Sequence, residues 1–238
     1  FYSDSVYIDQ LRHAVRSTGK MSEQRVPYNM RREARDALAD WWADRIDSAF
    51  FNQICGNTAE ADLRYTGMQA AVAPSPDRIL YAGSQDSEAS LVSTNTFNLT
   101  LIDYAVELAQ TNARGEVPDL RPLRINGEDK YVMFLHPYQI TDLRTSTDTG
   151  QWLDIQKAAM QGGQVSKNPI YTGALGEYNG VILQKAHRIP SVVANIRRAV
   201  LCGAQAASIA FGRESGQNTY TWVEEMYDFG NQLGVAAG

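Results

Sequence analysis

Apolar residues recur at helical spacing between Pro27 and Cys55, a stretch that contains "ALADWWADRIDSAFFNQIC". Residues three or four positions apart lie on one face of an α-helix, so the pattern predicts a single long helix. Pro27 suits its first turn, where a missing backbone N–H costs nothing, and Gly56 is a suitable C-terminal stop. At 1.5 Å per residue, a helix of up to about 28 residues is roughly 42 Å long. The apolar positions are Met30, Ala34, Ala37, Leu38, Trp41, Ile46, Ala49, Phe50 and Ile54.

Two adjacent tryptophans, Trp41 and Trp42, occupy the middle of this helix. Adjacent helical residues point about 100° apart, so the two rings cannot fill one pocket. We expect them to widen the apolar stripe, Trp41 on the side of Leu38 and Trp42 on the side of Ile46, with Arg45 stacking on Trp41. A helix that is apolar over more than half of its circumference needs cover on two sides. The chain's own sheet can supply one side and a neighbouring subunit the other.

The segments around the long helix predict a mixture of strands and helices. Loose alternation predicts a strand at 6–13, and the small polar residues of 57–95 predict a long surface loop or insertion. A second helix is expected to be capped by Thr96 and to end near Gly115. Alternation from Tyr220 onwards predicts a further strand.

The clearest turn signal is "PLRINGEDKYVMFL", which places Asn126–Gly127 between two β-prone runs and predicts a hairpin. His136–Pro137 ends its second strand. The remaining predicted elements are a short helix from Pro137 through Leu143, a helix over 150–163, a second hairpin at Asn179–Gly180, and a tightly packed helix or helix–strand pair over 194–211. Together these elements predict an α+β fold.

Composition and charge narrow the classes of function. The 238 residues are 44% hydrophobic and 21% charged, as in an ordinary globular protein. The net charge of −5 argues against a dedicated nucleic-acid-binding protein, which needs excess Lys and Arg on one face. The sequence contains no run of about 18 apolar residues, which is the length that would predict a membrane span. Cys55 and Cys202 lie far apart in apolar surroundings, so we expect two buried, reduced thiols in a cytoplasmic protein.

Candidate chemistry is sparse. None of His13, His136 and His187 has a Cys or His partner at metal-ligand spacing. The sequence contains no nucleophile elbow, phosphate-binding loop or dinucleotide fingerprint. We therefore expect no catalytic residue, no cofactor and no metal. For a soluble enzyme, the least implausible acid–base pair is His136 with Asp142.

Five stretches, taken in order, resemble one group of major capsid proteins of tailed double-stranded-DNA bacteriophages. They are "YSDSVYIDQLRHAVRS", "ALADWWADRIDSAFFNQICGN", "INGEDKYVMFLHPYQITDLR", "NPIYTGALGEYNGVIL" and "EEMYDFGNQLGVAAG". The resemblance runs across nearly the whole chain. It implies the Hong Kong 97-type (HK-97-like) major capsid protein fold, which encapsulin shells also use.

The resemblance gives each segment a place. Residues 1–16 correspond to the end of the extended loop and a peripheral strand. Residues 17–122 correspond to the peripheral domain, with the spine helix at 27–55 and an insertion at 57–95. Residues 123–211 correspond to the axial domain, and 212–238 return to the peripheral domain. An N-terminal arm with the first half of the extended loop would precede Phe1, and a final peripheral strand would follow Gly238.

The function implied is structural. Copies of the chain would assemble in the host bacterial cytoplasm into hexamers and pentamers of an icosahedral head. The head would enclose double-stranded DNA without sequence-specific binding, with scaffolding, portal and decoration proteins as further partners. The alternative with the same fold is an encapsulin-type shell around an enzyme cargo.

Two groups of residues carry these expectations. The spine helix would use five residues for packing or for contact with a neighbouring subunit: Leu38, Trp41, Trp42, Ile46 and Phe50. Arginines at its start would face the packaged DNA: Arg31, Arg32 and Arg35.

Overall fold

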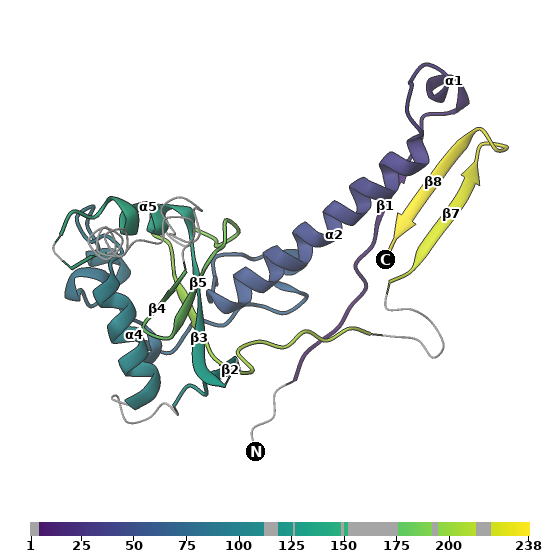
Figure 1. The fold of residues 1–238 in the computed structure, drawn as a ribbon. Coiled ribbons are helices and arrows are strands. Elements are labelled where there is room, and N and C mark those ends of the chain that lie inside the picture. Colours follow the sequence, from purple (N-terminus) through teal and green to yellow (C-terminus); the bar gives the residue numbers. More distant parts are fainter. Residues whose placement is uncertain are drawn as a thin grey trace. The chain divides into compact units, whose positions relative to one another are not determined.

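A long helix and two separate sheets make up the computed structural model, which describes residues 5–111, 119–125, 127–148, 150–151, 176–191, 195–212 and 220–238 (Figure 1). The mixture of helices and strands confirms the predicted α+β class. The chain divides into two compact units, each built from discontinuous segments. Unit 1 comprises Phe1–Gln53, Glu60–Ala71 and Ser208–Gly238, and unit 2 comprises Ile54–Ala59 and Val72–Ala207.

The predicted long helix is present as α2, Met30–Ile54. It begins later than the predicted residue 27 because Asn29, rather than Pro27, starts it. The Asn29 side chain accepts hydrogen bonds from the backbone N–H groups of Arg31 and Arg32, at 3.0 and 3.2 Å. These donors have no acceptor inside the helix, so the cap stabilises its first turn. The predicted stop at Gly56 is confirmed by its φ of 59°, a left-handed conformation that suits glycine.

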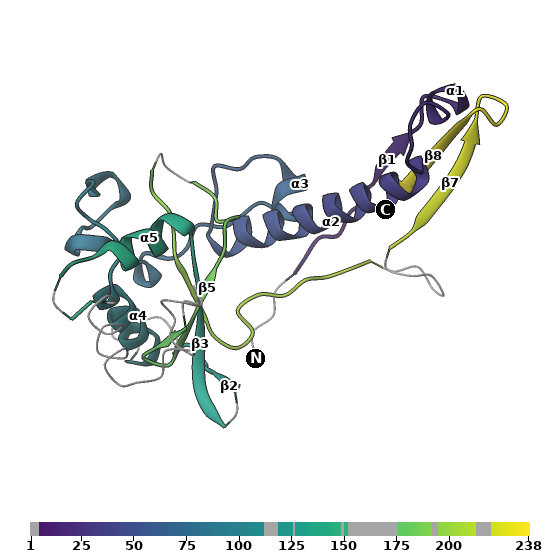
Figure 2. The same cartoon turned by 45° about the horizontal axis from the view of Figure 1, so that its top comes forward.

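Unit 1 contains an antiparallel three-stranded sheet in the order β1-β8-β7 (Figure 2). Its strands are β1 (His13–Arg16), β8 (Gln232–Ala237) and β7 (Trp222–Tyr227), and a short helix, α1 (Lys20–Glu23), follows β1. The predicted strand at 6–13 is wrong except for its last residue, because pairing with β8 fixes the register: His13 lies opposite Ala237 and Arg16 opposite Gly234.

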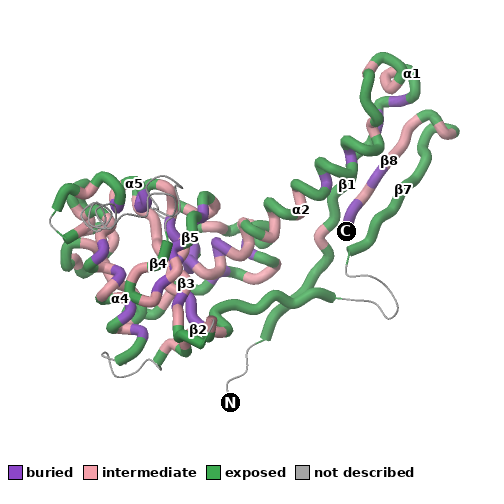
Figure 3. Tube along the Cα trace, in the orientation of Figure 1, coloured by how far each residue is buried: buried purple, intermediate pink, exposed green. Residues whose placement is uncertain are grey.

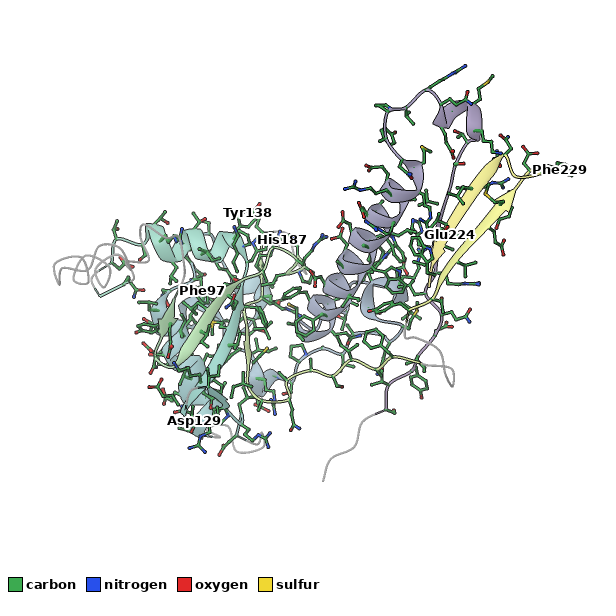
Figure 4. The ribbon with its side chains drawn as sticks, turned by 45° about the vertical axis from the view of Figure 1, so that its right-hand side comes forward. Phe97, Asp129, Tyr138, His187, Glu224 and Phe229 are labelled. Atoms are coloured by element: carbon green, nitrogen blue, oxygen red, sulfur yellow. The ribbon has the colours of Figure 1, made fainter. Side chains whose placement is uncertain are left out.

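The predicted strand from Tyr220 is confirmed in part, since it is a hairpin of two strands. Positive φ angles of 53°, 52° and 82° at Asp228, Phe229 and Gly230 turn the chain between β7 and β8. Phe229 projects from the tip of this hairpin (Figure 4) and is fully exposed. The run "YDFGN" lacks the Asn-Gly or Asp-Gly pair that marks the tightest hairpins, which is why the pattern predicts one continuous strand.

One face of this sheet packs against α2. Val235 and Ala237 alternate along β8 and are buried with Ala34 and Leu38 of the helix, while Leu233 is partly buried beside them. In contrast, β7 is exposed along its whole length (Figure 3). The hydrophobic cluster that holds this sheet to the helix is therefore a narrow seam between α2 and β8.

Unit 2 is built around a mixed sheet in the order β2-β3-β5-β4, with β6 also paired to β3. Its strands are β2 (Leu123–Ile125), β3 (Glu128–Leu135), β4 (Glu177–Tyr178), β5 (Val181–Lys185) and β6 (Val200–Cys202). The antiparallel pairs β2–β3 and β4–β5 confirm both predicted hairpins. Because β3 and β5 pair in parallel, the chain must cross over between them, and the predicted helix after β3, α5 (Pro137–Thr145), begins that crossover.

The core of unit 2 joins the apolar stripe of α4 (Leu99–Thr111) to alternate residues of β3 and β5 and one side of α5. Its buried members are Leu99, Ile102, Val106, Ala109, Tyr131, Met133, Leu135, Ile140, Leu143, Val181 and Leu183. Asn98, rather than Thr96, caps α4, since its side chain accepts from the Leu101 N–H at 3.1 Å. The predicted end of this helix near Gly115 lies outside the described residues.

The packing of α4 bears on the predicted division into domains. Its buried stripe contacts the strands of unit 2, so α4 belongs to that unit. The boundary predicted between residues 122 and 123 therefore does not coincide with a boundary between compact units. Segment 57–95 is itself divided, with Glu60–Ala71 in unit 1 and the rest in unit 2.

The predicted loop at 57–95 is confirmed as a segment without long elements. It contains one turn of α-helix, α3 (Leu63–Thr66), and three 3-10 turns: Pro76–Arg78, Ala82–Ser84 and Glu88–Ser90. It is more than a surface loop, because Thr66 is only 1% exposed and Asn57 and Ala71 are also buried.

The predicted helix or helix–strand pair over 194–211 is wrong. The described residues of this stretch, 195–211, contain the strand β6 and no helix. Gly203 explains the extended path: a Cβ atom there would collide with the carbonyl of Arg121, whose oxygen also accepts from the Ala204 N–H at 2.7 Å. The small residues allow this close approach to backbone and do not indicate helix packing. The predicted helix over 150–163 lies outside the described residues, apart from its first two positions.

Candidate functional site

The two residues considered for acid–base catalysis do not converge. His136 immediately precedes α5 and Asp142 lies in its middle, and at 100° per residue their directions differ by about 120°. Asp142 lines a cavity of about 850 Å³ in unit 2, and His136 is not among the lining residues. The described residues contain no group of three or more His, Cys, Asp or Glu placed to hold a metal ion. Over the same residues, no helix combines the length and apolar character needed to cross a bilayer.

The two cysteines are buried free thiols, as predicted. Burial raises the pKa of the Cys55 thiol to about 12, and it also raises that of Cys202. Both groups therefore stay protonated at neutral pH. Since the thiolate is the reactive form, neither is suited to act as a nucleophile or to exchange disulfides.

The predicted packing residues of α2 occupy three different environments. Leu38 is 1% exposed and lies at the centre of the seam with β8. Trp41 stacks on His13 of β1, with ring centroids 4.6 Å apart and planes inclined by 14°. Trp42 packs on the Leu38 cluster instead, which reverses the predicted assignment of the two rings. Ile46 and Phe50 are half-buried further along the helix.

The tryptophans belong to a continuous row of aromatic contacts in unit 1. Trp41 and Trp42 meet edge to face at 5.3 Å, Trp42 meets Tyr220 at 5.4 Å, and Tyr220 meets Phe211 at 5.8 Å. Tyr220 is 47% exposed and Phe211 51% exposed. The buried indole Nε1 of Trp42 has no hydrogen-bond acceptor within the described part of the chain. The row thus runs from a covered end beside β1 to an uncovered end before β7.

Arg45 confirms the predicted stacking on Trp41 and adds a second ring. Its guanidinium carbon lies 5.2 Å from the Trp41 centroid and 3.9 Å from that of Tyr65, which precedes the end of α3. A guanidinium beside aromatic faces is attracted by their negative π surfaces. Arg45 thereby ties the middle of α2 to the segment of 57–95 that belongs to unit 1.

The three arginines predicted to face DNA differ in their partners. Arg31 is held by Glu224 of β7, with its Nε 2.9 Å from both carboxylate oxygens, and this contact lowers the pKa of Glu224. Arg35 Nη2 lies 2.8 Å from Asp36 Oδ1, whereas Arg32 Nε lies 3.9 Å from Asp36 Oδ2. The Arg32 side chain is 77% exposed, against 63% for the other two. Of these three arginines, Arg32 is the one most available to another molecule.

The outward side of α2 is acidic. Its exposed acids, which we call the acidic ridge, are Glu33, Asp36, Asp40, Asp44 and Asp47. They follow the side of the helix turned away from the seam with β8. A surface of this charge repels phosphate groups.

The exposed face of β7 is a candidate surface that the sequence pattern did not single out. Trp222, Val223, Met226 and Tyr227 are all at least 41% exposed, and Phe229 follows at the hairpin tip. Large apolar residues on both faces of one strand are the signal that could have marked it, since a strand with one solvated face alternates apolar with polar residues.

The sequence model that describes the phage capsid protein family matches residues 1–238, which is the whole chain. The chain belongs to the phage capsid protein family. The major capsid protein of Pseudomonas phage KPP25 is 25% identical to this capsid chain over 260 residues, covering 97% of the chain and 66% of the relative. The chain thus spans about two thirds of the length of that relative.

Solved capsid structures share the fold of this capsid chain. The capsid of Ralstonia phage GP4 matches with a TM-score of 0.75 and 32% identity, over 97% of this chain and 67% of that one. The cyanophage Pam1 capsid matches with a TM-score of 0.64 at 17% identity, over 95% and 67% of the two chains. The head structure of Helicobacter pylori bacteriophage KHP40 matches with a TM-score of 0.65 at 15% identity, over 97% of this chain and 66% of that one. These likenesses confirm the predicted HK-97-like fold.

Proposed function

We propose that the chain is the larger part of a major capsid protein that assembles into the icosahedral head of a phage. The observation that carries this proposal is the family match over residues 1–238. The role is structural rather than catalytic. Hexamers and pentamers of the protein would form in the host bacterial cytoplasm and become part of the virion, with scaffolding, portal and decoration proteins as further partners.

In this proposal unit 1 serves as the peripheral domain and unit 2 as the axial domain. The long α2 and the sheet β1-β8-β7 of unit 1 support the first assignment. The second rests on the mixed sheet and its connecting loops in unit 2. Contacts between subunits would use the exposed face of β7 and the uncovered end of the aromatic row, because apolar surface left exposed on one chain is a common feature of protein interfaces.

Electron microscopy of the full-length protein tests the assembly. We expect uniform polyhedral shells, or rings of six and five subunits, because shape-matched apolar contacts repeated around symmetry axes favour closed assemblies. A protein that stays monomeric at high concentration would contradict the proposal. Shells that carry an enzyme cargo and no DNA would instead identify the encapsulin-type alternative.

We propose further that the start of α2 faces the packaged DNA, with Arg32 making the main contact. Its exposure and its long distance to Asp36 support this, since Arg31 and Arg35 are each closely paired with a carboxylate of the same chain. The acidic ridge would keep DNA from settling along the rest of the helix. Confinement without sequence-specific binding follows from this arrangement of charge.

Chemical protection of arginine in filled and emptied heads tests this contact. We expect an arginine-specific reagent to modify Arg32 more slowly in DNA-filled heads, because phosphates would shield its guanidinium. Modification is measured by peptide mass spectrometry, with the exposed Arg78 of segment 57–95 as the internal control. Equal modification of Arg32 in filled and emptied heads would remove it from the inner surface.

A further inference from the structure

The N-terminus of α5 is capped by a histidine, which is an unusual choice of residue. The backbone of His136 is extended, with φ −71° and ψ 149°, and its Nδ1 accepts a hydrogen bond from the Tyr138 N–H at 3.2 Å. Ser, Thr, Asp and Asn are the common residues at this position because their oxygens accept at any ordinary pH. An imidazole nitrogen accepts only while it carries no proton.

Next to this cap, Gln139 connects α5 to the segment before β6. The His136 N–H donates to Gln139 Oε1 at 2.9 Å, and Gln139 Nε2 donates to the Arg197 carbonyl at 3.0 Å. Gln139 is buried, so these bonds are shielded from water. The rings of His136 and Tyr138 are in contact, with centroids 4.7 Å apart, and the Arg197 guanidinium lies 5.5 Å from the Tyr138 centroid.

The groups around the imidazole favour its neutral form. Burial lowers the pKa of His136, and the neighbouring Arg197, before β6, and His187, after β5, lower it further. Tyr138, 61% exposed, is the titratable group on its own helix that contacts the ring. Figure 4 labels Tyr138 and His187 on the same edge of unit 2. A protonated ring would also place a positive charge at the positive end of the helix dipole.

We propose that His136 is a pH-dependent cap, whose imidazole stabilises the first turn of α5, beside the 196–198 segment, only while the ring is neutral. When Nδ1 gains a proton it becomes a donor, so it loses the Tyr138 N–H. The imidazolium is then repelled by Arg197 and by the N-terminus of α5. Acidification thereby loosens the first turn of α5 while the sheet of unit 2 keeps its pairing.

The direction of the pH effect follows from the lowered pKa of His136. Because the folded state binds its proton less readily than the unfolded state, the stabilisation by the cap is fully present above the ordinary histidine pKa of about 6.5. It is lost as the pH falls from there toward the lower folded-state value. The switch therefore operates on the acidic side of neutrality.

Hydrogen exchange of the full-length protein at pH 7.5 and 5.5, measured by mass spectrometry, tests the cap. After correction for the intrinsic pH dependence of exchange, we expect amides of α5 in the natural protein to exchange about tenfold faster at pH 5.5. In His136→Asn, whose amide oxygen does not titrate, exchange should stay slow at both pH values. In His136→Ala, which has no cap, it should be fast at both.

The neighbouring His187→Asn variant is the matched control, because it removes a nearby histidine and leaves the cap intact. It should keep most of the acid response of the natural protein. The proposal is overturned if His136→Asn shows the same acid-induced increase as the natural protein. A loss of the response in His187→Asn with its retention in His136→Asn would assign the switch to the other histidine. If His136→Ala fails to fold, the comparison of His136→Asn with the natural protein still tests the proposal.

Discussion

Replacing Leu38 by alanine is expected to lower the free energy of unfolding of unit 1 by about 3 kcal/mol. Leu38 is 1% exposed in a cluster whose other buried members, among the residues that the structure describes, are Ala34, Val235 and Ala237. The substitution removes the largest of the buried side chains in the seam between α2 and β8 and leaves a cavity there. Urea denaturation followed by tryptophan fluorescence measures the loss, since three of the four tryptophans, Trp41, Trp42 and Trp222, belong to unit 1.

Leu63→Ala is the matched control for this change. Leu63 also lies in unit 1 but is 47% exposed, so the same substitution should cost less than about 0.5 kcal/mol. Faster hydrogen exchange at Leu233 and Val235 in Leu38→Ala would locate the damage at the seam. A loss below about 1 kcal/mol for Leu38→Ala would mean that α2 is anchored elsewhere.

Arg198→Met should destabilise unit 2 by about 2–3 kcal/mol. Arg198 Nε binds Glu88 Oε1 at 2.7 Å, and its Nη1 donates to the carbonyls of Cys55 and Gly56 at 2.8 and 2.9 Å. These carbonyls follow the end of α2, where helix oxygens lack partners and a positive charge is favourable. Both side chains of the ion pair are about three-quarters buried, with exposures of 24% and 23%.

Met keeps most of the apolar length of the arginine side chain, so the substitution mainly removes its charge and hydrogen bonds. Hydrogen exchange should rise in this variant at Cys55 and around Glu88. Arg64→Met is the control: Arg64 also pairs with a carboxylate, at 2.6 Å from Asp62, but is 62% exposed. Solvent and salt screen such a pair, so we expect no resolvable change in stability. Equal effects of the two substitutions would show that the partly buried position of Arg198 confers no advantage.

Features that depend on neighbours in the sequence were predicted well. The helix α2, the hairpin of β2 and β3, and the turn from His136 into α5 all follow from local spacing and turn residues. Elements whose positions are fixed by partners distant in the sequence were not predicted well. The position of β1 depends on its register with β8, more than two hundred residues away, and no local pattern contains that information.

The same difference between local and long-range information separates the candidate surface residues that were predicted from those that were not. Local spacing placed Leu38 on an apolar side of α2, where it is buried, but it grouped Trp41 rather than Trp42 with that residue. It could not assign Trp41 to His13 or Arg31 to Glu224, because those contacts depend on strands that are paired through tertiary structure. The His136 cap was missed for another reason. Histidine is rarely expected to accept from a helix N-terminus, so its position before Pro137 reads as the end of a strand.

The discontinuous units have a consequence for dissecting the protein genetically. The chain passes from one unit to the other between residues 53 and 54, 59 and 60, 71 and 72, and 207 and 208. Neither unit can therefore be produced as one uninterrupted fragment, and a single cleavage within 57–95 leaves the two covalently joined. Removing the residues before 54 or after 207 takes away part of unit 1 alone, whereas a truncation at 59/60 or 71/72 removes part of both units, so a deletion series would give misleading boundaries. Circular permutation or paired cleavage at two crossings is the way to separate their contributions.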